Sequence, residues 1–448
     1  MSTVLAAGRV VTSAAVHTPG WVEVDAGRVA GVGPGRPERI DVDYGAATIV
    51  PGFVDIHVHG GGDGDFNDAD TASVRRARAA HLARGTTASV ASLVTLSTSR
   101  LRTSVERLAP LVEEGLVEGV HLEGPCLNPL RRGAHDPVHL RHPDPAELRA
   151  VLGTGVVSMV TLAPELPGAL DAIAAIADAG AVAAVGHTDA DYATARAAVA
   201  AGARVGTHLF NAMRPLHHRD PGPIAALMED ERVTVELIAD GTHLHPAVYR
   251  HVLAAVGDGR VALVTDAMRA AALGDGRYAL GTLDVDVVDG VATLAGTETI
   301  AGSTATMDAL FRTALGQHAL AFPQASSSPA AQSGSAAQSG SAASSGPAEP
   351  AGQAEPSARP QPSDGAWTSA VRQTATTPAA AMGWGHVGDL APGRRADAVV
   401  LDGELRVVDV LRQGASVGAR AVPGASGRGR PGQPNGSHAA GASEGRSG

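Results

Sequence analysis

Residues 51–66 read PGFVDIHVHGGGDGDF, and this stretch indicates how the middle of the chain folds. Its apolar part, 54–58, has the character of a buried strand and leads into a glycine-rich loop. The amphipathic, Ala-rich stretch 71–83 that follows predicts a helix. The same order of strand, loop and helix recurs along the chain. The eight runs that we expect to form strands are 54–58, 87–92, 117–122, 156–162, 182–186, 204–207, 234–239 and 261–265.

Eight strand–helix alternations predict an α/β fold, a (β/α)8 TIM-type barrel over residues 51–383. Residues 1–50 instead alternate Val with polar residues between turns, and a similar pattern returns in 384–422. We expect these two segments, from the two ends of the chain, to pair into one small β-sandwich domain.

Two further segments have a composition that predicts disorder. Residues 324–365 contain no Val, Ile, Leu, Met or aromatic residue and carry the hexamer AAQSGS twice, at 330–335 and 336–341. Such an insert cannot bury enough apolar surface to offset its chain entropy. The tail 423–448 is rich in Gly, Ser and Arg, and we expect it to be disordered too.

The bulk composition limits the partners of the chain. The formal net charge is −11, and no dense basic cluster suggests nucleic acid. The single Cys126 cannot form an intramolecular disulfide and fits a reducing cytoplasm. The start, MSTVLAAGRVV, does not have the pattern of a signal peptide, and no apolar run reaches membrane-spanning length. We therefore expect a cytoplasmic protein without nucleic-acid or membrane partners.

Six of the eight predicted strands end in His, Glu or Asp. In a (β/α)8 barrel the carboxyl ends of the strands form one face, where functional groups gather. Random placement of these residue types would rarely produce this pattern. The residues concerned are His57, His59, His121, Glu123, His187, His208, Asp240, His243 and Asp266.

The spacing of these residues favours a metal site. His57 and His59 are two apart, so on a strand both imidazoles point to the same side and can bind one metal. Glu123 ends an apolar strand, and a buried carboxylate needs a metal or a cation. The chain contains no Lys, which excludes a carboxylated lysine as a bridge between two metals. Glu123 is therefore the natural bridging or anchoring ligand.

His187 and His208 end successive strands and complete a set of two imidazoles and one carboxylate, which leaves an open position for water. Beside that water, Asp266 can accept a proton and later pass it to a leaving amine. Both interpretations have a structural alternative, because these residues can also cap helices or be satisfied polar groups of the core. The ligand types suit Zn, Fe, Co or Mn, with one or two ions per subunit.

The ordered motifs of the chain resemble the N-acetylglucosamine-6-phosphate deacetylase family of the amidohydrolase superfamily. Closing patterns at 377–383 (TPAAAMG) and 388–402 (GDLAPGRRADAVVLD) are shared more widely among amidohydrolases. The motifs that carry the closer resemblance, after the opening stretch, are HLEGPCLN (121–128), RRGAHDP (131–137), TLAPE (161–165), GHTDADY (186–192), THLFNAM (207–213), RDPG (219–222), IADGTHLHP (238–246), LVTDAM (263–268) and IAGSTATM (300–307).

The resemblance implies a metal-dependent hydrolase that removes the acetyl group from N-acetyl-D-glucosamine 6-phosphate, in amino-sugar catabolism or cell-wall recycling. It implies the main metal at Glu123, His187 and His208, and Asp266 as general base and acid. Family members that keep the first-strand histidines, here His57 and His59, can hold a second metal. The residues matched to the substrate are Ala134 and His135 for the sugar, Asn211, Ala212, Arg219 and His243 for the phosphate, and Ile300, Ala301 and Gly302 for the acetyl and sugar pocket. The resemblance further implies a homodimer in which the arginine comes from the neighbouring subunit.

Two other functions remain open at this point. The chain could be another amidohydrolase, such as a deaminase or a cyclic-amide hydrolase, which would share the strand-end residues. It could also be an inactive barrel that serves as a binding protein, although the intact ligand set at Glu123, His187 and His208 argues against that alternative. Acetate release from phosphorylated and unphosphorylated sugar separates these possibilities.

Overall fold

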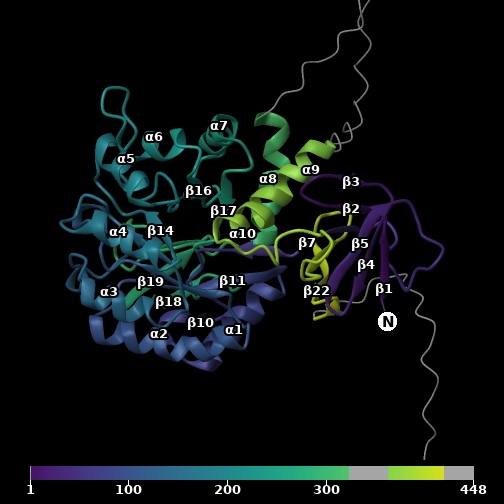
Figure 1. Cartoon of the computed structure of the whole chain (residues 1–448), viewed down its shortest axis with the longest axis horizontal. Coiled ribbons are helices and arrows are strands. Elements are labelled where there is room, and N and C mark those ends of the chain that lie inside the picture. Colours follow the sequence, from purple (N-terminus) through teal and green to yellow (C-terminus); the bar gives the residue numbers. More distant parts are fainter. Residues whose placement is uncertain (1, 322–361, 418–448) are drawn as a thin grey trace, which may run out of the picture.

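The computed structural model describes residues 2–321 and 362–417, and its largest element is a parallel sheet of eight strands (Figure 1). The strands pair in chain order, each parallel to the next. Each predicted strand is present, with ends that differ by at most three residues from the apolar runs. The strands are β8 (Phe53–Asp55), β11 (Thr86–Leu93), β12 (Gly119–Glu123), β13 (Val157–Leu162), β14 (Val182–Val185), β15 (Val205–Gly206), β16 (Thr234–Leu237) and β17 (Val261–Leu263).

A seam between the first strand, β8, and the last strand, β17, closes the barrel. The backbone N–H of Asp266 donates to the carbonyl of His57 at 2.8 Å. Beneath it, the buried Asp55 carboxylate accepts the hydroxyl of Thr265 at 2.6 Å and the backbone N–H of the same residue at 3.2 Å. These bonds bring the residues that follow the first and last strands to the same place.

Helices follow the barrel strands and cover the outside of the barrel (Figure 1). Asp70, Asp144 and Asp191 begin three of them, because each carboxylate accepts backbone N–H groups of the first turn. The eight parallel strands with helices on the outside confirm the predicted (β/α)8 fold class. The helices are α1 (Thr71–Leu82), α2 (Thr98–Glu113), α3 (Pro145–Leu152), α4 (Ala169–Asp178), α5 (Tyr192–Ala201), α6 (Gly222–Glu229), α7 (Pro246–Val256) and α8 (Met307–Ala321), followed by α9 (Asp364–Val371) and α10 (Thr377–Ala381).

Two sheets beside the barrel form the small β domain, and both ends of the described chain contribute to it. In Figure 1 the purple strands of the amino-terminal part lie beside the yellow β22. Val22, Ile49 and Val400 belong to the apolar cluster shared by the two sheets. One sheet orders β5 (Arg28–Pro34), β4 (Gly20–Asp25), β1 (Thr3–Ala7) and β6 (Val42–Asp43); the other orders β23 (Ala415–Ser416), β22 (Val407–Arg412), β21 (Ala398–Leu401), β7 (Thr48–Pro51), β2 (Arg9–Val11) and β3 (Val16–His17).

Two smaller sheets lie in loops that follow barrel strands. After β8, the strands β9 (Gly60–Gly61) and β10 (Gly64–Asp65) form a short hairpin. After β17, a three-stranded meander of β18 (Gly276–Leu280), β19 (Leu283–Val288) and β20 (Val291–Leu294) precedes α8. The chain returns from this meander to the barrel through 295–303, so that this segment can border the carboxyl-end face.

The predicted insert and tail fall largely outside the described residues, which exclude 322–361 and 418–448. The helix α9 begins at Asp364, capped by the hydroxyl of Ser363, so the last two residues of the predicted insert belong to a helix. A Ser followed by a first-turn Asp is a start signal that composition alone conceals. Within the described ranges, no helix is long and apolar enough to cross a membrane.

Candidate active site

A cavity of about 370 Å³ opens at the carboxyl ends of the barrel strands. Most of the residues predicted for the site line it, and so do several that were not predicted. The lining residues include His59, Glu123, Arg131, Ala134, His135, His187, His208, Asn211, Ala212, His243, Asp266, Glu298, Ile300 and Gly302. The strand ends therefore meet at one cavity, as the barrel geometry requires.

Three of the residues predicted to bind metal or to transfer protons have a left-handed backbone. The φ angles are +48° at His187, +26° at His208 and +47° at Asp266. Residues other than glycine adopt this region infrequently, and such strain gathers at functional sites. Directly before His187, Gly186 leaves no room for a side chain, because a Cβ there would lie 2.7 Å from Thr161 Cγ2 and from Thr207 Cβ. The turn after β14 thus places His187 tightly against its neighbours.

Glu123 lies at the centre of the site. Its Oε1 is 3.0 Å from Nε2 of His187 and 2.9 Å from Nε2 of His208. Its Oε2 is 3.1 Å from Nε2 of His59. Burial by itself would raise the pKa of Glu123, but the facing imidazoles, His57 and His135 above all, hold it well below its usual range. The carboxylate is therefore ionised and faces imidazoles from several strands.

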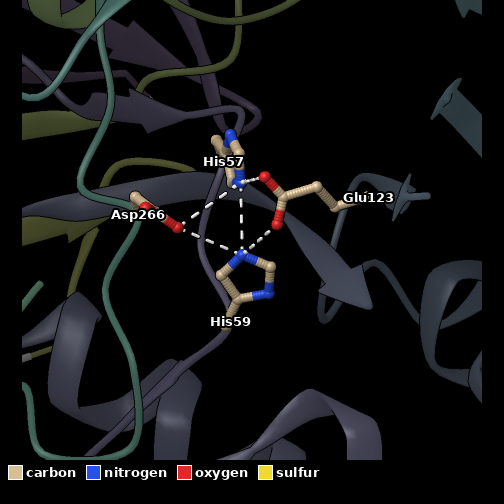
Figure 2. A group of neighbouring side chains, drawn as sticks. All are labelled: His57, His59, Glu123 and Asp266. Carbon is tan, nitrogen blue, oxygen red and sulfur yellow. Dashed lines mark hydrogen bonds and ion pairs between the residues drawn. The ribbon is translucent and has the colours of Figure 1, made fainter. Parts of the chain in front are cut away.

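His57 and His59 join Glu123 and Asp266 in a second compact group (Figure 2). The Asp266 Oδ1 is 3.4 Å from Nε2 of His57 and 3.1 Å from Nε2 of His59. Figure 2 shows Glu123 and Asp266 approaching the two imidazoles from opposite sides. One ligand atom from each of these residues falls within 4.8 Å of all the others, a spacing that can hold a metal ion.

Hydrogen bonds at the other ring nitrogen show which imidazoles can bind a metal. Nδ1 of His187 lies 2.8 Å from the carbonyl of Arg131, and Nδ1 of His59 lies 3.2 Å from the carbonyl of Ser92. A carbonyl only accepts, so each Nδ1 carries a proton and Nε2 is the ring nitrogen that faces the site and can bind a metal. Nδ1 of His57 likewise donates to the carboxylate of Glu236, at 3.1 Å.

The same contacts show that a metal fits this site. Nε2 of His57 is 3.2 Å from Nε2 of His59, and Nε2 of His187 is 3.1 Å from Nε2 of His208. Each pair of facing nitrogens can share either a proton or a cation, and the residues around the first pair have the spacing of a metal site. Imidazole with carboxylate is a common ligand set for a divalent metal. The cluster can hold a divalent metal ion.

His135 differs from these imidazoles in its tautomer. The backbone N–H of Thr95 donates to Nδ1 of His135 at 3.2 Å, and the hydroxyl of Thr95 lies 2.8 Å from the same atom. Nδ1 is therefore an acceptor, and the proton lies on Nε2. Nε2 of His135 is 3.3 Å from Glu123 Oε2, and His135 forms with Glu123 and His187 a group whose spacing could hold a metal ion, but the proton on Nε2 makes it a hydrogen-bond donor to the carboxylate.

Two of the predicted substrate residues do not line the cavity. Ala301 is buried and packs in an apolar cluster that includes Met268 and Val285. Arg219 is exposed on the loop before α6, where its guanidinium contacts His218. Asp220, the carboxylate that could have paired with Arg219, instead binds Arg214. Within one copy of the chain, Arg219 therefore does not reach the cavity.

Some residues that contact the site had no predicted role in it. Glu236 on β16 contacts His57, and Arg131 lines the cavity. Asp240, named only as a strand-end residue, binds His243. Burial lowers the pKa of His243, but the Asp240 carboxylate, 2.8 Å from Nδ1, raises it above the ordinary value overall. Glu236 interrupts the apolar run 234–239. A charged residue inside a strand expected to be buried was the signal that could have indicated its role.

Comparisons with known proteins agree with this geometry. Residues 48–349 match the model of the amidohydrolase family. The N-acetylglucosamine-6-phosphate deacetylase of Vibrio furnissii is 37% identical over 272 residues, which cover 59% of this chain and 68% of that protein. The N-acetylgalactosamine-6-phosphate deacetylase of Escherichia coli O157:H7 is 35% identical over 322 residues, 70% of this chain and 83% of that protein.

A solved structure is similar over nearly the whole chain. It is the N-acetyl-D-glucosamine-6-phosphate deacetylase of Mycobacterium smegmatis, an Asp-to-Ala variant in complex with N-acetyl-D-glucosamine 6-phosphate. The identity is 48% and the TM-score 0.82, over 93% of this chain and 100% of that one. Together with the family match over 48–349, this extent of similarity shows that the chain belongs to the amidohydrolase family and, within it, to the N-acetylglucosamine-6-phosphate deacetylases.

Proposed function

We propose that this chain hydrolyses the acetamide bond of N-acetyl-D-glucosamine 6-phosphate, producing D-glucosamine 6-phosphate and acetate. The observation that carries this proposal is the convergence of Glu123, His187, His208 and Asp266 on one cavity. The substrate is supported by the M. smegmatis relative, which is 48% identical and binds this phosphosugar.

The metal ligands of the proposal are Glu123, His187 and His208 for the first ion. His57 and His59 add a second position, for which Glu123 is the shared carboxylate. Carboxylate and imidazole ligands accommodate Zn, Fe, Co or Mn, and availability selects among them. His135 is excluded from both positions by its protonated Nε2.

A divalent metal, when bound here, supplies Lewis-acid activation of the water and of the acetyl carbonyl. Asp266 then accepts the proton of the attacking water. Burial would raise the pKa of Asp266, but His57 and His59 hold it well below its ordinary value, so the carboxylate is ionised as a base must be. Nε2–H of His135 donates to the oxyanion that forms at the acetyl carbon. Asp266 finally returns the proton to the departing amine.

The phosphate end of the substrate needs donors that the metal ligands do not provide. In the proposal, Asn211, Ala212 and His243 border the phosphate. Arg131 is the one arginine among the residues lining the cavity, and the chain contains no lysine. Its guanidinium contacts Asp189 through Nε and Nη2, both at 2.8 Å, and the N–H groups of Nη1 remain for a phosphate. Arg219 completes this end from a second copy of the chain, as part of a homodimer.

The proposed location is the cytoplasm. It is supported by the free Cys126, the only cysteine of the chain, which is consistent with a reducing compartment.

The test is acetate release by the purified chain, with the metal content measured on the same sample. The substrates are N-acetylglucosamine 6-phosphate, its galactosamine epimer and N-acetylglucosamine without phosphate. We expect the 6-phosphate of N-acetylglucosamine to be preferred over both others. Preference for the galactosamine epimer would instead indicate an N-acetylgalactosamine-6-phosphate deacetylase, the activity for which the E. coli relative is named. Indifference to phosphate would leave only a general amidohydrolase, and no turnover of any substrate would indicate a binding protein.

A further inference from the structure

Glu236 on β16 is a completely buried carboxylate beside the metal ligands, with 0% of its surface exposed. Its Oε2 accepts from Nδ1 of His57 at 3.1 Å and from the backbone N–H of His208 at 3.2 Å. Its Oε1 has no hydrogen-bond partner among the described residues. A carboxylate in such a place is costly unless positive charge lies close by. No arginine pairs with it in the described part of the chain, where its one ion-pair partner is His57.

We infer that Glu236 is the positioning residue that makes the His57/His59 position a metal site. The inference rests on the proposed function, because it concerns the second metal of the same centre. The carboxylate fixes the proton of His57 on Nδ1, which turns the lone pair of Nε2 toward His59 and strengthens His57 as a ligand. A glutamate in this role acts through His57 and touches neither substrate nor reacting atoms.

Charge balance supports the same conclusion. One divalent ion is neutralised by the two carboxylates that face the imidazoles, Glu123 and Asp266. A second divalent ion in this buried place requires further negative charge. Among the described residues, Glu236 is the one carboxylate outside the facing set that contacts a ligand side chain. Its charge therefore favours two ions over one.

The contact between Glu236 and His208 predicts that changing Glu236 has a smaller effect on the first metal position, which is formed by Glu123, His187 and His208. Glu236 holds only the backbone N–H of His208, whereas the side chain of His208 faces Glu123 and His187. In Glu236→Gln an amide oxygen can accept both hydrogen bonds, so the substitution removes the charge with little change of shape. The first ion should stay bound.

The experiment counts metal ions in the full chain, without substrate. Metal-free protein is titrated with Zn²⁺, and bound ions per subunit are measured after removal of free metal. We expect two ions in the wild type and one in Glu236→Gln, with the affinity for the second ion lowered about 10- to 100-fold, as for other outer partners of ligating histidines. His57→Asn should also bind one ion, and the double variant should bind one and not fewer, because both changes act on the same position.

A matched control is Glu231→Gln, which removes an exposed carboxylate a few residues away and should leave two ions bound. Two ions of unchanged affinity in Glu236→Gln would overturn the inference, as would a wild type that binds only one ion or a variant that binds none. The count is independent of turnover. Two ions in the wild type and one in the variant, without deacetylation, would contradict only the proposed function; deacetylation with two ions in both proteins would contradict only the inference.

Discussion

The backbone N–H of Thr95 donates to Nδ1 of His135 at 3.2 Å, which leaves the imidazole proton on Nε2 within the cavity. One histidine of the cluster is thus a donor at Nε2 whose Nδ1 accepts, whereas Nδ1 of His59 and of His187 faces a backbone carbonyl and carries a proton. Since a buried donor aimed at a developing oxyanion contributes strongly to hydrolysis, this relationship separates the role of His135 from those of the metal ligands.

His135→Ala should lower kcat by about 10²- to 10³-fold, the usual effect of removing one oxyanion donor. Metal content should stay the same, because Nε2 of His135 carries a proton and cannot be a ligand. The measurements are steady-state kinetics and elemental analysis on one preparation. Loss of a metal ion in this variant would show that the tautomer assignment is wrong.

Glu123→Gln should lose bound metal and activity together. Both oxygens of Glu123 face imidazoles, at 2.9 Å from His208 and 3.1 Å from His59, so neutralising this one carboxylate weakens both metal positions. Metal content by elemental analysis and acetate release on the same sample check this. A variant that retains full activity without metal would contradict the ligand assignment.

Asp266→Asn should keep the first metal ion and substrate binding but lose turnover by about two to four orders of magnitude, as for a general acid–base residue. Asn tolerates the left-handed backbone at this position, where φ is +47°, so the variant isolates the proton transfer from the fold. Substrate binding by calorimetry and single-turnover kinetics separate the two effects. Near-normal turnover would make Asp266 only a structural residue.

Arg219→Ala should remove most of the preference for the phosphorylated sugar and leave the slow rate on N-acetylglucosamine nearly unchanged. Arg219 does not line the cavity of its own chain, so its effect requires a second copy. Diluting the wild type until it is monomeric should then weaken the preference in the same way. The control is Arg102→Ala, another exposed arginine, which pairs with Glu106 on α2. Equal losses on both sugars would indicate a role in folding or in the interface.

Acid should destabilise the protein through His81. Burial lowers the pKa of His81 to about 4, and its Nε2–H donates to the carbonyl of Gly60 at 2.8 Å. Because the folded pKa lies below the unfolded value of about 6.5, the unfolded chain binds the extra proton, and stability falls as pH drops from about 6.5 to 4. The loss from this residue is about 3 kcal/mol at most. It is measured as the difference in unfolding free energy between wild type and His81→Gln, and a difference that does not change with pH would contradict it.

Much of the site could be predicted from the sequence, because in a barrel the carboxyl ends of the strands lie next to one another. Glu123, His187 and His208 are far apart in the sequence, yet each follows an apolar run, and the fold brings them within hydrogen-bond distance. Glu236 was missed for the opposite reason. It lies inside the strand β16, whereas its partner His57 follows β8, at the far end of the sheet order, so no local pattern joins them.

Other features depend on contacts that no single sequence expresses. The proton position on His135 follows from the backbone N–H of Thr95, forty residues away along the chain. Arg219 sits outside its own cavity, so its proposed role depends on a second copy of the chain. The start of α9 at Asp364 lay within the low-complexity composition of the insert, which hid the capping Ser363.

The seam between β8 and β17 also bears on when the protein can acquire metal during its synthesis. His57 and His59 follow the first barrel strand and Asp266 follows the last, so at about 5 to 20 residues per second a ribosome needs roughly ten to forty seconds to supply the missing carboxylate. A nascent chain that already exposes its histidine pair has only half of that coordination shell. In the proposed assignment the ligands of this position come from both ends of the barrel, so its loading should wait until translation has delivered the final strand, and a bound ion would then link the two ends.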